Sequence, residues 1–82
     1  MMKEKYIYNY SSLMGLIKEK YGTQEKFAEV LGLGRVSLSQ RLNNKLEFRQ
    51  SEIKYAVELL EIPKESIGGY FFVVKDSKIV DK

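Results

Sequence analysis

The sequence contains neither cysteine nor histidine. Without cysteine the chain has no disulfides, thiolate metal ligands or thiol nucleophiles. Without histidine it lacks the usual zinc sites and imidazole acid–base catalysis. We therefore predict that the protein is not an enzyme, and that it has no catalytic residues, metal site, cofactor or small-molecule substrate.

Long apolar runs are also absent. No run approaches the roughly 18 residues of a membrane span, and the N-terminal segment MMKEKYIYNYSS lacks the apolar core of a signal peptide. We expect a cytoplasmic protein with no membrane partner. A length of 82 residues suits one domain, residues 1–82, whose small core would gain stability from an oligomer interface.

The charge that is present is unevenly distributed. The chain has 14 Lys and Arg residues against 11 Asp and Glu residues. Between Arg35 and Arg49 four cations accompany one anion, Glu47, whereas the other residues carry ten charges of each sign. A local basic surplus on a small protein is typical of nucleic-acid binding.

Apolar residues recur at helical spacing in five segments, and capping residues delimit them. Ser11 or Ser12 can cap the first helix, and Thr23 can cap the second. Gly32 and Gly34 supply turn angles before the third, because a residue with a Cβ adopts such angles only at a cost. The predicted helices span residues 12–21, 24–31, 35–43, 50–60 and 63–67, with Gly68 and Gly69 ending the last.

Both ends of the chain have β character. Residues 1–10 are predicted to form an N-terminal arm or strand. Residues 71–82 are predicted to form a strand or hairpin tail, because 71–74 and 78–80 are β-rich runs around a polar turn. The tail has two possible partners, Lys5–Tyr8 or a second subunit. The predicted fold is mostly α, a compact domain of four to five helices with short β segments at the termini.

Residues Thr23–Asn44 have the layout of a helix-turn-helix, two short helices joined by a tight glycine turn. Leu38 and Leu42 lie four residues apart and anchor the third helix inward. At roughly 100° per residue, Val36 and Gln40 then fall on the opposite side.

Three residues on this helix are predicted to contact DNA bases. Arg35 can present two donors to guanine, Gln40 can pair with adenine, and Val36 suits a thymine methyl group. Short polar or cationic side chains nearby suit phosphates, which set register but carry little sequence information. These predicted backbone contacts are Ser37, Ser39, Arg41, Asn43, Asn44 and Lys45.

The segments YNYSSLMGLIKEKYGTQEKFAEVLG, LSQRLNNK, FRQSEI and GGYFF resemble small phage-encoded Cro-like proteins, within the Cro/repressor-type (XRE-like) helix-turn-helix regulators. The resemblance covers Tyr8–Phe72 and implies a repressor-like DNA-binding domain. It implies that Gln24 bonds a phosphate and that Ala28, Gly32 and Leu38 fix the angle between the two helices. It also implies the base contacts of Arg35, Val36 and Gln40 and the backbone contacts of Asn43, Asn44 and Lys45.

Two residues depart from that family's pattern. Arg41 occupies a place that many members fill with an apolar residue, so Leu42 would take over that packing. Arg49 stands where Ser or Thr often caps the fourth helix, so the sequence predicts a weak cap there.

The expected function is sequence-specific binding of double-stranded DNA. A homodimeric repressor would place residues 35–43 in the major groove of operator half-sites and so regulate transcription. The alternative is a protein-binding helix-turn-helix module of the antitoxin or antirepressor type, which acts through a protein partner. The basic cluster from Arg35 to Arg49 favours DNA, because a protein-binding module would not require it.

Overall fold

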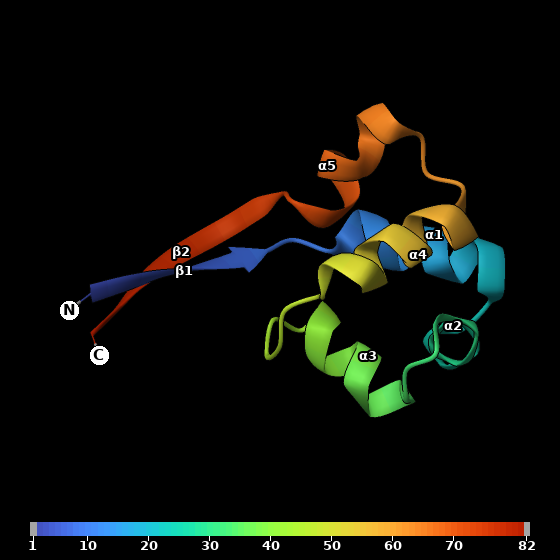
Figure 1. Ribbon diagram of the computed structural model, residues 1–82, viewed down its shortest axis with the longest axis horizontal. Coiled ribbons are helices and arrows are strands. Elements are labelled where there is room, and N and C mark those ends of the chain that lie inside the picture. The colour runs from blue at the N-terminus through green and yellow to red at the C-terminus, as the bar shows by residue number, and fades with distance from the viewer. Residues whose placement is uncertain (1, 82) are drawn as a thin grey trace.

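The computed structural model describes the backbone of residues 2–81 and the side chains of residues 6–75. It contains five helices and a two-stranded sheet formed by the two ends of the chain (Figure 1). This confirms the predicted fold class. The elements are β1 (Met2–Tyr8), α1 (Ser11–Tyr21), α2 (Gln24–Leu31), α3 (Arg35–Leu42), α4 (Gln50–Leu60), the 3-10 turn η1 (Lys64–Ser66), α5 (Ile67–Phe71) and β2 (Val74–Asp81).

Local capping explains where the first helices begin. The Thr23 hydroxyl accepts a hydrogen bond from the Lys26 backbone N–H at 3.1 Å, as expected for an N-cap. At α1 the predicted serine cap was wrong: the N-cap position is Tyr10, whose side chain makes no cap bond, and the Asn9 side-chain oxygen accepts from the Ser11 N–H at 2.9 Å.

The turn between α2 and α3 depends on one glycine rather than two. Gly32 has a φ of 86°, in the left-handed region that favours glycine. Gly34, the N-cap of α3, has a φ of −72°, which any residue adopts. The expectation of a special angle at Gly34 was therefore wrong.

The fifth helix also differs from its prediction. Residues 64–66 form a 3-10 turn, and α5 then continues through Gly68 and Gly69 to Phe71. Phe71 is fully buried and packs edge-on against Phe48, with 5.5 Å between ring centroids. Burial of this ring outweighs the low helix propensity of two glycines, roughly 1 kcal/mol each.

The core is formed by the inward faces of the helices and by residues next to them. Burial raises the pKa of the Tyr10 hydroxyl to about 12, with smaller contributions from Tyr8 and Glu47, so this ring remains neutral. Within the described part of the chain, no helix has the length and apolar character needed to cross a membrane. The buried hydrophobic side chains are those of Tyr10, Leu13, Ile17, Phe27, Ala28, Leu31, Leu38, Leu42, Ala56, Leu60, Ile62 and Phe71.

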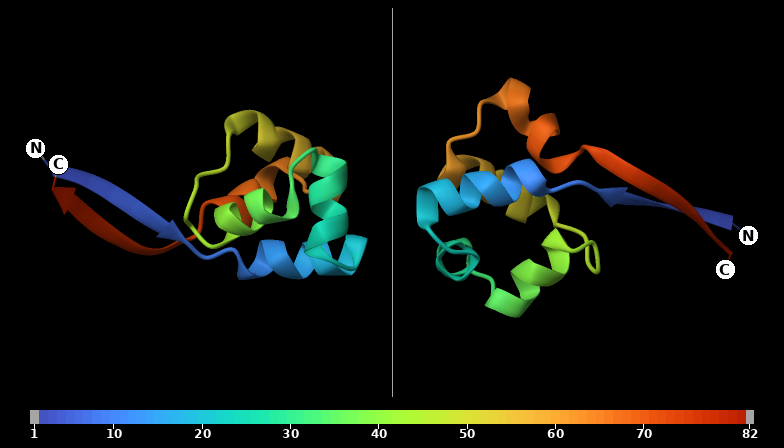
Figure 2. Two further views of the ribbon diagram at one scale, coloured as in Figure 1. Left: turned by 90° about the horizontal axis from the view of Figure 1, so that it is seen from below. Right: turned by 180° about the vertical axis from the view of Figure 1, so that it is seen from behind.

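The two strands form an antiparallel ribbon that projects from the helical body, with both termini at its tip (Figures 1 and 2). Met2 lies opposite Asp81 and Tyr8 opposite Val74, with an irregularity between Ile7 and Tyr8. Residues Val74–Asp81 thus form one continuous strand, and the hairpin considered within residues 71–82 was wrong. Its partner is the N-terminal segment, the first of the two predicted.

Asn44 joins this ribbon to the loop that follows α3. Its side-chain oxygen accepts from the Tyr8 N–H at 2.9 Å, and its side-chain nitrogen donates to the Tyr8 carbonyl at 2.9 Å. Asn44 also adopts a φ of 62°, which asparagine tolerates better than most residues with a Cβ. One side chain therefore satisfies both backbone groups of Tyr8 and fixes the base of the ribbon.

We predict that Asn44→Gly lowers the free energy of unfolding by about 1–3 kcal/mol, because it removes two hydrogen bonds while keeping the left-handed backbone accessible. Urea unfolding measures this loss, and hydrogen exchange should show faster exchange at the Tyr8 amide. Asn43→Gly, at the exposed neighbouring position, serves as the control. Equal losses in both variants would argue against the role of Asn44.

Candidate functional site

Helices α2 and α3 form a helix-turn-helix whose outer side is hollowed. The hollow has a volume of about 1050 Å³. We call it the α2–α3 groove. It is lined by Thr23, Gln24, Glu25, Arg35, Val36, Ser39, Gln40, Asn43 and Lys45.

This groove brings together seven of the ten residues predicted to contact DNA. The three predicted base-contacting residues, Arg35, Val36 and Gln40, all line it, and Val36 is 63% exposed. Gln24, Ser39, Asn43 and Lys45 line it as well. The sequence therefore located one continuous surface, whatever partner that surface serves.

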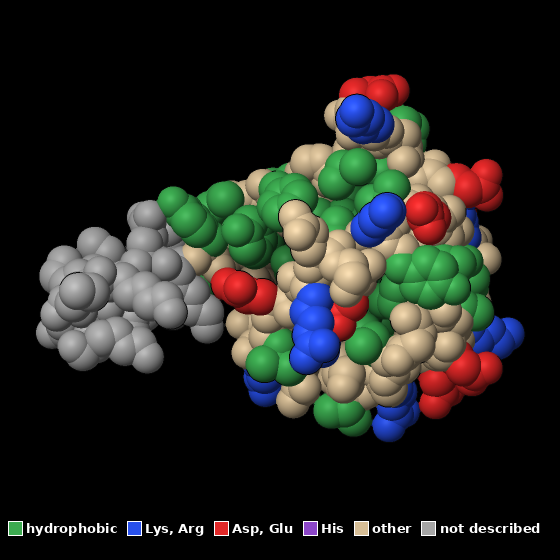
Figure 3. Space-filling view, viewed as in Figure 1, with side chains coloured by type: hydrophobic (Ala, Val, Ile, Leu, Met, Phe, Trp, Pro, Cys, Tyr) green, Lys and Arg blue, Asp and Glu red, His purple; other side chains and the backbone are tan. Residues whose placement is uncertain are grey.

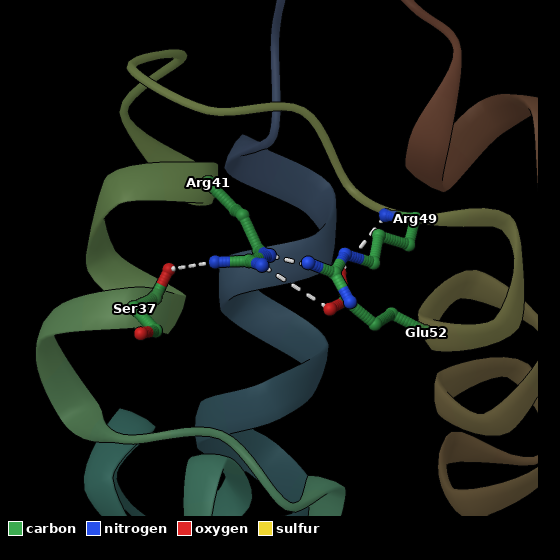
Figure 4. Close-up of polar contacts among 4 residues, drawn as sticks. All are labelled: Ser37, Arg41, Arg49 and Glu52. Atoms are coloured by element: carbon green, nitrogen blue, oxygen red, sulfur yellow. Dashed lines mark hydrogen bonds and ion pairs between the residues drawn. The ribbon is translucent and has the colours of Figure 1, made fainter.

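Arg41 lies outside the groove. It is buried, with its guanidinium held between α3 and α4 (Figure 4). Its Nε donates to Glu52 Oε1 at 2.8 Å, its Nη2 to Glu52 Oε2 at 3.2 Å, and its Nη1 to the Ser37 carbonyl at 2.9 Å. The predicted phosphate contact from Arg41 was wrong, because these three bonds occupy the guanidinium inside the protein. Leu42 is buried beside it, as expected.

Glu52 is the residue that sequence reasoning missed. Besides Arg41, it accepts a hydrogen bond from the Arg49 backbone N–H at 2.9 Å and so caps the start of α4 (Figure 4). Burial acts to raise the pKa of Glu52, but the hydrogen bonds and charges of Arg41 and Arg49 lower it overall. The sequence did contain a signal for this pair. Arg41 follows Leu38 by three residues and so lies on the same, inward face of the helix. A charged side chain on a buried face almost always has a charged partner.

Asn44 is also unavailable in the predicted way, because both polar atoms of its side chain are bonded to Tyr8. The predicted Asn44–phosphate contact was wrong for that reason. The half-buried Ser37 does not line the groove, and its backbone carbonyl, not its hydroxyl, accepts from Arg41. Asn43 remains exposed, with its amide nitrogen bonded to the Ser39 carbonyl at 2.8 Å.

These contacts reduce the basic surplus at the surface. Of the four cations between Arg35 and Arg49, Arg41 is neutralised by Glu52. The groove itself combines Arg35 and Lys45 with the acidic Glu25 and several uncharged polar side chains. With two cations and one anion, its lining carries a net charge of +1, which is smaller than the surplus of three positive charges that residues 35–49 carry in the sequence. The electrostatic support for DNA binding is therefore weaker than the sequence alone indicates.

The described residues give no indication of a metal centre, since they contain no group of three or more acidic side chains placed to hold an ion.

Two comparisons identify relatives of this chain. Residues 6–74 match the model of the family described as "Protein of unknown function (DUF739)". The chain is similar to the solution structure of the modulator of repression (MOR) of the temperate bacteriophage TP901-1 from Lactococcus lactis, with 46% sequence identity and a TM-score of 0.70. This similarity covers 79% of our chain and 88% of that one. No curated protein matches.

These findings correct the expectations of family and function. The assignment to the Cro/repressor-type regulators was wrong, since the matching family is DUF739 and the similar structure is a modulator of repression. The expected roles as a DNA-binding transcriptional repressor and the expected operator partner are overturned by the same findings. The homodimer was expected from the analogy with those regulators and from the small core, and these findings remove the first of the two grounds. The phage origin of the similar protein agrees with the expected phage link.

We predict that Arg41→Met and Glu52→Gln each destabilise the protein, Arg41→Met by about 3 kcal/mol, because each leaves a mostly buried charge without its partner. The double variant should lose less than the sum of the two by at least about 1 kcal/mol. Urea unfolding at neutral pH measures all three values. Strict additivity would mean that the two side chains do not act as a pair.

Acidification should weaken the protein partly through Glu52. The pKa of Glu52 is depressed in the folded state. Its contribution to the free energy of unfolding is therefore complete above the ordinary pKa of glutamate, about 4.3, and is lost as the pH falls through the folded-state pKa. Stability measured from neutral pH downward should therefore fall less in Glu52→Gln than in the wild type. Glu58→Gln, at an exposed position of α4, is the control and should follow the wild type.

Proposed function

The chain belongs to the DUF739 family, and from this premise we propose that it modulates repression in a phage by binding a repressor protein. The observation that carries this proposal is the 46% identity to the modulator of repression of phage TP901-1. That identity extends over most of both chains, and the two folds agree with a TM-score of 0.70.

The described surface supports a binding role. The α2–α3 groove is open, its lining combines two cations and one anion with uncharged polar groups, and it presents Val36, an aliphatic side chain that is 63% exposed. Mixed polar and apolar surfaces of this kind are common in non-obligate protein interfaces. The proposed role is non-catalytic, and the protein would act in the cytoplasm, where its repressor partner binds DNA.

The direct test combines the purified chain with the repressor of the same phage. We expect a stoichiometric complex in size-exclusion chromatography and isothermal calorimetry. We also expect addition of the chain to change how much operator DNA the repressor occupies in a titration.

The chain added to operator DNA without repressor is the control, and it should leave the mobility of the DNA unchanged. Absence of any complex, together with unchanged operator occupancy, would refute the proposal. A shift of the operator by the chain alone would contradict it as well, because the effect would not require the repressor.

A further inference from the structure

A second hollow lies between α4 and α5. Its volume is about 480 Å³, and the two hollows share no lining residue. We call it the α4–α5 groove. Its apolar lining consists of Ile53, Val57, Ile62, Ile67 and Phe72, and its charged or polar lining of Gln50, Lys54, Glu58 and Lys64.

Phe72 forms a ridge at one side of this groove. Its ring is 52% exposed, and it also lines a smaller neighbouring hollow of about 140 Å³. The ring packs edge-on against Tyr8, with 6.2 Å between centroids, and Val73 and Val74 beside it are 40% and 50% exposed. Figure 3 shows hydrophobic side chains gathered here, between the base of the ribbon and the helices. A contiguous apolar patch of this kind marks an interaction site.

The backbone around the groove determines which kind of segment can occupy it. Helices α4 and α5 satisfy their own backbone groups, and the Ile62 and Phe72 N–H groups donate to the carbonyls of Val57 and Gly68. An extended peptide would find no backbone partner on these helices. A helix brings its backbone already paired and can lay an apolar face into such a groove.

The charged side chains at the rim further limit which partner can bind in this groove. Lys54 and Lys64 are exposed, and neither forms an ion pair with any described side chain. With Glu58, they give the rim a net positive charge. In a two-fold contact with a second copy, each positive rim would face another, which is unfavourable.

We propose that the α4–α5 groove receives an amphipathic helix of the repressor, with apolar side chains against Phe72 and acidic side chains beside Lys54 and Lys64. This inference rests on the proposed function and adds to it the surface used and the chemistry of the docking segment. The contact lies apart from the α2–α3 groove, with which it shares no lining residue.

The test measures binding of the phage repressor to the full chain and to surface variants by isothermal calorimetry. Phe72→Ser and the double variant Lys54→Glu/Lys64→Glu should each weaken the complex about tenfold or more. Raising the salt concentration should weaken the wild-type complex more than that of the lysine double variant. Circular dichroism and urea unfolding establish that each variant is folded.

Matched controls share the chemistry but not the location. Tyr55→Ser changes a 46% exposed aromatic ring of α4 that does not line the groove, and Lys26→Glu reverses an exposed lysine of α2. Both should bind the repressor within about twofold of the wild type.

The outcomes separate this inference from the proposed function. If the wild type binds the repressor and the groove variants bind equally well, the groove assignment is overturned while the function stands. If the wild type does not bind, both fail. If light scattering shows a dimer that Phe72→Ser dissociates, with repressor binding unchanged, the occupant is a second copy and our assignment is wrong.

Discussion

The carboxylate of Glu52 is the contact on which the arrangement of α3 and α4 depends. It accepts from the Arg41 side chain and the Arg49 backbone, while Arg41 also binds the Ser37 carbonyl within α3 (Figure 4). One acid thereby starts α4 and holds α3 against it. Because a mostly buried ion pair contributes less net stability than apolar packing would, its main effect is to specify this orientation.

With α3 held in this orientation, the protein has two separate grooves, one between α2 and α3 and one between α4 and α5. The lining of the α2–α3 groove is mainly polar, whereas that of the α4–α5 groove is mainly apolar, and each contains two cations and one anion. An 82-residue chain has little surface to spare, and two hollows without a common residue allow one partner to be bound while the other face stays open. Substitutions on one face should therefore leave the other unaffected, since they share no contacts.

The positions of the first four helices followed from the sequence because capping and apolar spacing act locally, as at Thr23 and along α4. Contacts between distant residues did not. The Asn44–Tyr8 pair joins residues 36 apart, and Arg41 meets Glu52 across two helices. Polar side chains that appeared free for DNA were thus already bonded within the protein. The prediction of DNA as the partner was also wrong. A helix-turn-helix and a basic segment determine the shape and charge of a surface, but they do not determine which molecule binds to it.

The antiparallel ribbon brings the two ends of the described chain together, with Met2 opposite Asp81. The two ends of the backbone therefore lie side by side at the tip of the ribbon, away from the helical body (Figure 2). The tip of the ribbon also lies beyond the residues 6–74 that match the family. A domain or label attached to either end would extend from that tip, and both grooves would remain accessible.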